Sequence, residues 1–362
     1  MTKKLSFLAL FAAVAMLCAA PALSVKNAYF PNASVAVTIN AAKFNRSFLG
    51  ELAGNDIIGV ALEGAEIEID PNDPIQAQLK ALLEKSNITF TTELSVSEAS
   101  SGLEPEKAVE KSMACVEFPQ PLGPLVDGLI AQMAATQKDG MTFEPIVING
   151  FKGVKITDNK DGVAVAMVFS ANGKCLFLAT PATLTKQLTE EAAAAAPAQL
   201  LAAQANAVDG FFLNLGIILT DEIKAMAAEA SPEAAGFAST VNAISFSASG
   251  SGELVNLKLG ANFITPEIAG SIKATIDSDL LPMVQPMASS MAQGSDVSFV
   301  NTLACSLDGT LVNLTCSLSQ NDIFTIMQIF NSATSGQGAD DLDEDGDDED
   351  EDGVEVEEVM SY

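Results

Sequence analysis

A unit of two alternating strands followed by a capped helix recurs along this chain, and it restricts the fold more than any other feature. The clearest copy begins near Val241, where apolar residues alternate up to Gly250-Ser251-Gly252 and then back to Phe263. Thr265-Pro266-Glu267 supplies a cap with proline at the first helical position, which predicts a helix to about Asp277. This pattern predicts a half-buried hairpin packed under a helix.

A second copy follows directly. Asp308-Gly309 is a hairpin signal, and as the central pair of a two-residue turn it would place Cys305 opposite Val312. In that register Cys316 lies roughly 13 Å from Cys305, whereas a disulfide needs Cα atoms within about 7 Å. We therefore predict that these two cysteines do not bond to each other and that both sulfurs lie on the apolar face of the hairpin.

A capping box is predicted where this hairpin leads into its helix. Ser319 and Asp322 have the spacing at which each side chain binds the other residue's backbone amide. The apolar residues Ile323, Met327 and Phe330 follow at helical spacing. The segment therefore predicts a helix packed on the hairpin.

Weaker copies of the unit lie upstream. Each combines alternating strands with a turn signal or with a polar cap. They are Val163 to Ala179 around Asn172-Gly173, with a helix after Thr180-Pro181; Phe211 to Leu219, with a helix after Thr220; and Ile57 to Ile69, with a helix after Asp73-Pro74. The repetition predicts an α+β fold of antiparallel sheets with helices packed on one face, built from two related halves.

Changes in composition divide the chain further. Glu190-Glu191, five alanines and Pro197 predict a helical connector at residues 192–207, between an N-terminal α+β domain at 28–191 and a C-terminal α+β domain at 208–331. After Ser332 the sequence becomes rich in glycine and acid and loses its apolar periodicity. Such a segment cannot bury enough apolar surface to fold, so we predict a disordered acidic tail at 332–362.

The first 22 residues have the three parts of a secretory signal peptide. Lys3 and Lys4 are positively charged, Leu5 to Leu17 is apolar, and Ala20-Pro21-Ala22 offers the small residues that a signal peptidase reads. We expect export to the periplasm or the medium, with cleavage near Ala22 (1–22). A lipid anchor at Cys18 is the less favoured alternative. No later stretch approaches about 18 uninterrupted apolar residues, so we expect no transmembrane segment.

Composition excludes several classes of function. The chain has no His, which removes His-dependent nucleophilic catalysis and imidazole zinc sites, and it has no Trp and only two Tyr for stacking on sugars or bases. A net charge of −29 opposes binding to nucleic acid and to anionic lipid headgroups. We therefore expect a protein that is not an enzyme, that does not bind nucleic acid, and whose electrostatic partners are cations or basic proteins.

Four cysteines remain once the leader is removed: Cys115, Cys175, Cys305 and Cys316. An exported chain permits disulfides among them, and three pairings are possible. Four buried thiols are the favoured interpretation, because a free thiol packs as a small core residue.

The acidic tail partly matches a calcium-binding loop. Asp341, Asp343, Asp345 and Asp352 fall at loop positions 1, 3, 5 and 12, with Gly346 at position 6. The match is incomplete, because position 8 is acidic, position 12 is Asp rather than Glu, and no amphipathic helices flank the loop. A solvated tail is the favoured interpretation, with weak diffuse cation association or specific calcium binding as alternatives. No other cofactor is expected.

Two segments resemble the sheet-and-helix pattern of exported bacterial proteins classed as domains of unknown function. They are GELVNLKLGANFITPEIAGSIKATIDSDLLP and LACSLDGTLVNLTCSLSQNDIFTI. The resemblance extends over about residues 140–332. It implies a fold type and a secreted context, and it supplies no catalytic residues.

A curved sheet with helices over one face can also hold an apolar ligand. A lipid-sized cavity would be lined by Phe246, Leu257, Leu259, Phe263, Leu303 and Leu314, although filling of the core by these residues is favoured.

We expect an exported, non-enzymatic cell-envelope protein that acts by binding or assembly. A periplasmic carrier of an apolar ligand such as a lipid and a carboxylate-dependent hydrolase are the alternatives, and the oligomeric state stays open.

Overall fold

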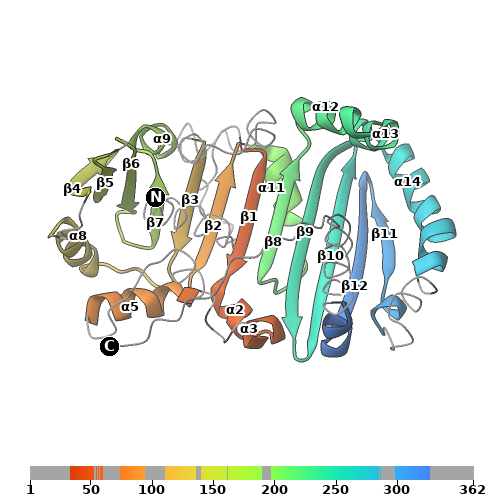
Figure 1. Ribbon diagram of the computed structural model, residues 1–362, viewed down its shortest axis with the longest axis horizontal. Coiled ribbons are helices and arrows are strands. Elements are labelled where there is room, and N and C mark those ends of the chain that lie inside the picture. Colours follow the sequence, from red (N-terminus) through yellow and green to blue (C-terminus); the bar gives the residue numbers. More distant parts are fainter. Residues whose placement is uncertain are drawn as a thin grey trace, which may run out of the picture.

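The strands of the protein form one continuous antiparallel sheet (Figure 1). The computed structural model describes residues 33–52, 54, 56, 58–59, 74–93, 111–135, 140–160, 162–189, 197–284, 286 and 298–326. Within them the sheet has twelve strands in the order β11-β12-β10-β9-β8-β1-β2-β3-β7-β6-β5-β4. The predicted α+β class and antiparallel pairing are confirmed. The predicted signal peptide and acidic tail lie outside the described residues.

The strands are short in the N-terminal part of the chain and longer in the hairpin β9–β10. Their bounds are β1 (Val35–Asn40), β2 (Asn87–Thr92), β3 (Ser112–Glu117), β4 (Met141–Ile148), β5 (Phe151–Asp158), β6 (Ala164–Phe169), β7 (Cys175–Ala179), β8 (Leu213–Ile218), β9 (Val241–Ser251), β10 (Leu254–Phe263), β11 (Ala304–Asp308) and β12 (Leu311–Ser319).

The helices connect the strands and follow them. They are α2 (Ala41–Asn45), α3 (Phe48–Leu52), α5 (Pro74–Leu83), α8 (Leu125–Ala135), α9 (Pro181–Gln187), α11 (Ala198–Ala205), α12 (Asp221–Ala230), α13 (Pro232–Thr240) and α14 (Pro266–Thr275), which continues into a π-helical turn, η2 (Ile276–Leu280). A 3-10 turn, η3 (Ser298–Asn301), precedes β11, and residues 320–326 form a helix after β12. None of the helices in the described ranges is long and apolar enough to cross a membrane.

The two halves of the sheet share one order of elements. Each starts with a central strand (β1 or β8), continues through helices to two adjacent strands (β2 and β3, or β9 and β10), and ends with a hairpin whose last strand pairs beside the second of them. The N-terminal half adds the hairpin β4–β5. Because β1 and β8 pair antiparallel, the first strands of the two halves run in opposite directions. Helices α2 and α3 lie at the lower ends of the strands in Figure 1, and α12 and α13 lie at the upper ends. That the two halves are related stays a prediction.

The predicted connector contains a helix that packs on the centre of the sheet. Gln204 of α11 accepts a hydrogen bond from Thr38 Oγ1 of β1 (2.7 Å) and donates one to the Ala36 carbonyl (2.8 Å). Asn214 of β8 donates to the Gln204 side-chain and backbone oxygens (3.0 and 2.8 Å). Gly216 allows this approach, because a Cβ there would lie 3.2 Å from Gln204 Nε2. The buried amide thus joins the first strands of both halves.

Helices cover both faces of the sheet. On one face, Leu184 and Leu188, at the C-terminal side of α9, pack with Cys115 and Phe177. On the other, Val116 of β3 packs with α5 and α8. Since residues alternate between faces along a strand, α9 and α11 lie opposite the larger group of helices.

The hairpin β11–β12 has a different register from the predicted one. Asp308 pairs with Leu311, so Gly309 and Thr310 form the turn and Cys305 lies opposite Leu314. The positive φ falls on Gly309 (59°), the first central residue, which is typical of a type II′ turn. Cys316 is therefore two residues along β12 from the partner of Cys305, where the predicted register placed it four residues along. Both cysteines are nevertheless free thiols.

The predicted helix caps are confirmed. The side chains of Thr180, Thr220 and Thr265 each accept a hydrogen bond from the third helical amide. At the capping box, the Ser319 amide donates to Asp322 Oδ2 (2.8 Å) and the Asp322 amide donates to Ser319 Oγ (3.2 Å). The same carboxylate, which is fully buried, also accepts from the Ser298 amide and hydroxyl, so it fixes the loop before β11 as well.

One hairpin was not predicted although its sequence signal is strong. Asn149 and Gly150 join β4 to β5 with φ values of 51° and 85°, as in a type I′ turn. The expected strand at residues 57–69 lies almost entirely outside the described residues, whereas the expected helix after Pro74 is α5.

We expect Gln204→Leu to lower the free energy of unfolding by about 1–3 kcal/mol, because the buried Thr38 hydroxyl loses its acceptor. The matched control is Gln199→Leu on the exposed side of the same helix, which should change stability by less than about 0.5 kcal/mol. Urea unfolding of both variants measures the difference. Equal stabilities would show that the amide does not hold the two halves together.

The buried carboxylate of Asp322 gives stability that depends on pH. Burial opposes its ionisation, but the hydrogen bonds from Ser319 and Ser298 outweigh this and hold the Asp322 pKa below its usual value. Because the folded-state pKa is depressed, this contribution is present above the unfolded-state pKa and is lost as pH falls through the folded-state value.

We therefore expect Asp322→Asn to cost about 1.5–3 kcal/mol at neutral pH, because charged hydrogen bonds are lost. The difference from the wild type should narrow as the pH is lowered into the acid range. Chemical unfolding across this range measures it, with Asp308→Asn in the exposed turn as the control. A difference that stays constant with pH would contradict this assignment.

Candidate functional site

A row of non-polar residues crosses the whole sheet at mid-height. Strand pairing places one residue from each strand side by side on the same face, in a line perpendicular to the strands. In strand order these residues are Cys305, Leu314, Leu259, Phe246, Leu215, Val37, Phe90, Ala114, Leu178, Met167, Val154 and Pro145. We call this set the apolar row.

Much of the apolar row is incompletely covered. Leu259 is 44% exposed although it lies on an interior strand of the sheet. Its neighbours Phe246, Leu215 and Leu314 are half-buried, and so are Val37 and Phe90 in the adjoining strands. Interior strands normally bury such residues, because burial of a large apolar side chain contributes about 1.5–3 kcal/mol. The central part of the row is therefore an incompletely covered apolar surface on interior strands.

Helices at the lower ends of the strands in Figure 1 cover the line of residues below the row. Leu213, Ala248 and Leu257 pair side by side in the next line of residues. They pack against Phe44 of α2 and Phe48 of α3. Ile323, in the helix at residues 320–326, belongs to the same cluster.

Helices at the upper ends of the strands cover the line of residues above the row. Ile244, Ala261 and Val312 pair in the line on that side and pack against side chains of α12, α13 and α14. The two groups of helices thus hold the two ends of the apolar face. The apolar row runs between them.

In β1, β8, β9, β10 and β12 the reverse face of the sheet is polar. Thr38, Asn214, Ser247, Lys258 and Thr315 pair side by side, one residue along from the apolar row in each strand. The contrast follows from the period of two in a strand, which sends successive side chains to opposite faces. An apolar molecule would therefore bind on one face only.

The six residues predicted to line a cavity are divided between clusters. Phe246 and Leu257 belong to the lower cluster, and Phe263 and Leu314 belong to the upper one. Leu259 lies on the row between the two. Leu303, half-buried, lies immediately before β11. The interpretation as core filling holds for Phe263, which is 1% exposed, but not for Leu259.

The sequence did not indicate the part of the row that lies in β1, β2 and β8. The strands that contain Val37 and Leu215 have the same alternation of apolar residues as the later strands, and this alternation could have indicated that both residues lie on the apolar face. That they continue the line from Phe246 depends on the pairing of β1 with β8, which joins residues far apart in the sequence.

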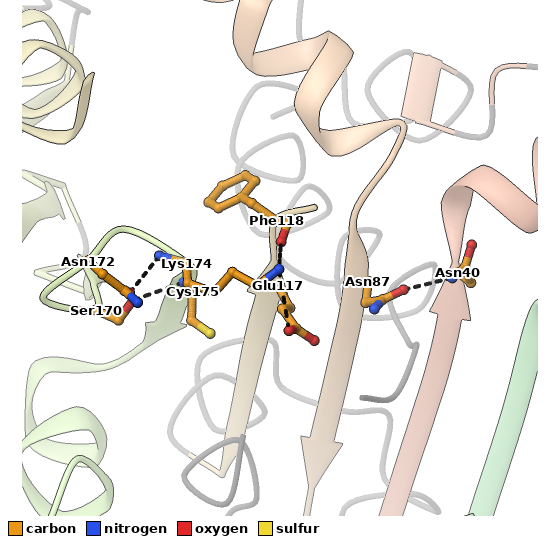
Figure 2. Close-up of polar contacts among 8 residues, drawn as sticks. All are labelled: Asn40, Asn87, Glu117, Phe118, Ser170, Asn172, Lys174 and Cys175. Atoms are coloured by element: carbon orange, nitrogen blue, oxygen red, sulfur yellow. Dashed lines mark hydrogen bonds and ion pairs between the residues drawn. The ribbon is translucent and has the colours of Figure 1, made fainter. Parts of the chain in front are cut away.

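Polar contacts fix the ends of β1, β2, β3 and β7 below the row (Figure 2). Asn40 Nδ2 donates to Asn87 Oδ1 (2.8 Å) across the β1–β2 pair. Lys174 Nζ donates to the Phe118 carbonyl and lies 3.6 Å from Glu117 Oε1. Glu117 is 12% exposed at its side chain and faces Cys175. One carboxylate held by a lysine is not the carboxylate pair that glycoside hydrolysis requires.

The described residues hold no group of three or more Asp, Glu, Cys or His side chains that could bind a metal ion. The calcium-loop residues Asp341, Asp343, Asp345 and Asp352 lie outside the described residues. Their proposed role in weak calcium binding therefore stays a prediction.

Comparisons with known proteins identify no family for the chain. No protein-family model and no curated protein matches it. Among solved structures it is similar to TP0453 in crystal form I, with a TM-score of 0.41 and 9% identity over 86% of this chain and 98% of that one. Crystal form IV of TP0453 gives a TM-score of 0.40 and 10% identity over 82% and 93%. Similarity at this level supports no conclusion about fold or function.

Proposed function

We propose that the chain is an exported, non-enzymatic protein of the cell envelope that binds an apolar ligand, such as a lipid, along the apolar row. The observation that carries this proposal is the exposure of Leu259 in the middle of a line of non-polar side chains on interior strands. Adjacent strands are about 4.8 Å apart, so the stretch from Cys305 to Phe90 extends for about 29 Å. That length suits a long hydrocarbon chain lying across the strands.

The chemistry of the row supports a ligand that is recognised by shape and apolar contact. Its central members are Leu, Phe and Val, which offer no hydrogen bonds, so affinity must come from removing apolar surface from water. The acidic surface of the chain disfavours a ligand with a strongly anionic headgroup. A neutral or cationic amphiphile is therefore the best fit.

Assembly with another protein and carboxylate-dependent hydrolysis are the other candidate functions. Assembly would use the same apolar surface. Hydrolysis has less support, because ordered carboxylates such as Asp127 and Glu144 form ion pairs with lysines. Export itself rests on the leader sequence.

Substitution of Leu259 by Glu is expected to weaken the binding of a fluorescent long-chain fatty alcohol by about tenfold or more, because the buried complex would have to desolvate a carboxylate. Fluorescence titration of the purified chain measures this. Leu254→Glu is the matched control: Leu254 lies on the same strand, is 43% exposed and points to the opposite face, so binding should be unchanged.

If the wild type fails to bind the alcohol, or if both variants bind as tightly as the wild type, the apolar row is not the binding surface. Native mass spectrometry of freshly purified protein gives a second measurement, in which a copurified lipid should be present in the wild type and reduced in Leu259→Glu.

Export predicts that the mature protein begins near Leu23. N-terminal sequencing of the protein recovered from the periplasm or the medium of expressing bacteria measures this. Removal of the charges at Lys3 and Lys4 should slow processing, because the positive region of the leader is lost. Recovery of an uncleaved chain from the cytoplasm alone would contradict export without bearing on the apolar row.

A further inference from the structure

Cys115 and Cys175 are neighbours in the core although 60 residues separate them in sequence. Cys115 of β3 lies opposite Phe177 of β7, and Glu117 lies opposite Cys175. Since alternate residues of a strand share a face, the two cysteines are diagonal neighbours on one face of the sheet. Both belong to the cluster that Leu184 and Leu188 cover. Each thiol shifts the pKa of the other.

The two thiols have unequal environments. Cys115 is 2% exposed in the middle of β3, and burial raises its pKa well above the usual value. Cys175 is the first residue of β7, next to the loop that carries Lys174. The hydrogen bond from Cys115 lowers the Cys175 pKa, burial and Glu117 oppose this, and Lys174 adds to it. Cys175, which is 8% exposed, thus forms the thiolate more readily, and Cys115 is its diagonal neighbour.

The remaining cysteines provide a contrast within the same chain. Cys305 and Cys316 are also diagonal neighbours, because Cys305 lies opposite Leu314 and Cys316 is two residues further along β12. Burial raises the pKa of both thiols. Neither is paired with a thiol of lowered pKa.

We propose that Cys115 and Cys175 form a redox-active pair, which a low-molecular-weight disulfide converts into an intramolecular disulfide. In the first step the Cys175 thiolate attacks one sulfur of the small disulfide RSSR. A bond forms between the two sulfurs, the S–S bond of RSSR breaks, and the departing RS⁻ takes up the proton that Cys175 lost.

In the second step the Cys115 thiolate attacks the Cys175 sulfur. The mixed disulfide breaks, and the second RS⁻ leaves with the proton from Cys115. The protein loses two protons and two electrons in total, and RSSR is reduced to two RSH. The β3–β7 register places the resolving thiol diagonally beside the attacked one before the reaction begins.

The geometry also predicts that the bond is labile. Diagonal neighbours in a sheet have Cα atoms about 7–8 Å apart, with Cβ atoms closer, which is at the upper limit for a disulfide. Closing the bond requires β3 and the start of β7 to approach each other. Disulfides strained in this way are more easily reduced than structural ones.

The test treats the reduced, folded full chain with oxidised glutathione. Samples are acid-quenched and alkylated after unfolding, and tryptic peptides are identified by mass spectrometry. We expect residues 112–138 to be linked to residues 175–186, with loss of two hydrogen atoms relative to the separate thiol peptides. Cys305 and Cys316 should be alkylated in the same sample, which makes them the internal control.

Single substitutions separate the two steps. Cys115→Ala should stop at a glutathione adduct on Cys175, because the resolving thiol is absent. Cys175→Ala should leave Cys115 as a free thiol. Circular dichroism checks that each variant is folded.

The wild type alone decides the outcome if a variant does not fold. The proposal is wrong if Cys115 and Cys175 both remain free thiols in excess oxidised glutathione, or if Cys305 and Cys316 become linked to each other as fast as this pair. A glutathione adduct that appears on Cys115 before Cys175 would also overturn it.

Discussion

The fold depends on the antiparallel pairing of β1 with β8, because among the described strands this pair joins the two halves of the sheet. Its backbone hydrogen bonds are supported by one buried amide. Gln204 binds Thr38 in β1 and Asn214 in β8, so the contact spans the junction between the halves. Buried hydrogen-bonding groups are costly to leave unpaired. Helix α11 therefore stabilises the junction between the halves and does more than connect them in sequence. The continuity of the sheet, and hence of the apolar row, follows from this pairing.

The apolar row is a product of registers that are set by separate turns and connections. Within the C-terminal half, the type II′ turns at Gly252 and Gly309 keep Leu259, Phe246 and Leu314 in line. A shift of one residue at either turn would move a whole strand's apolar set to the polar face. Helices attach where side chains above and below the row provide contact area, and Leu259 between them stays 44% exposed.

Local features could be predicted from the sequence, and pairings between distant segments could not. The caps at Thr180, Thr265 and Ser319 depend on residues within one helical turn, and the structure contains each of them. The turn after Asp308 was misassigned because Asp-Gly suits a type I′ turn, whereas the strands here adopt the II′ alternative with Gly309 first. The site was only partly predictable. Leu259 belongs to a readable alternating strand, but its place beside Phe246 and Leu215 requires the partner of β8 to be known.

Pro145 ends the apolar row on β4, the last strand on one side of the described sheet. Proline has no amide hydrogen, so this edge lacks one of the donors that an added strand would need. The opposite edge is β11, which has only five residues. A sheet that carries a long apolar face could readily grow by recruiting strands from other copies, and such growth leads to insoluble fibres. With one border interrupted by proline and the other kept short, the chain can leave Leu259 exposed on its face without offering a long edge as a template for aggregation.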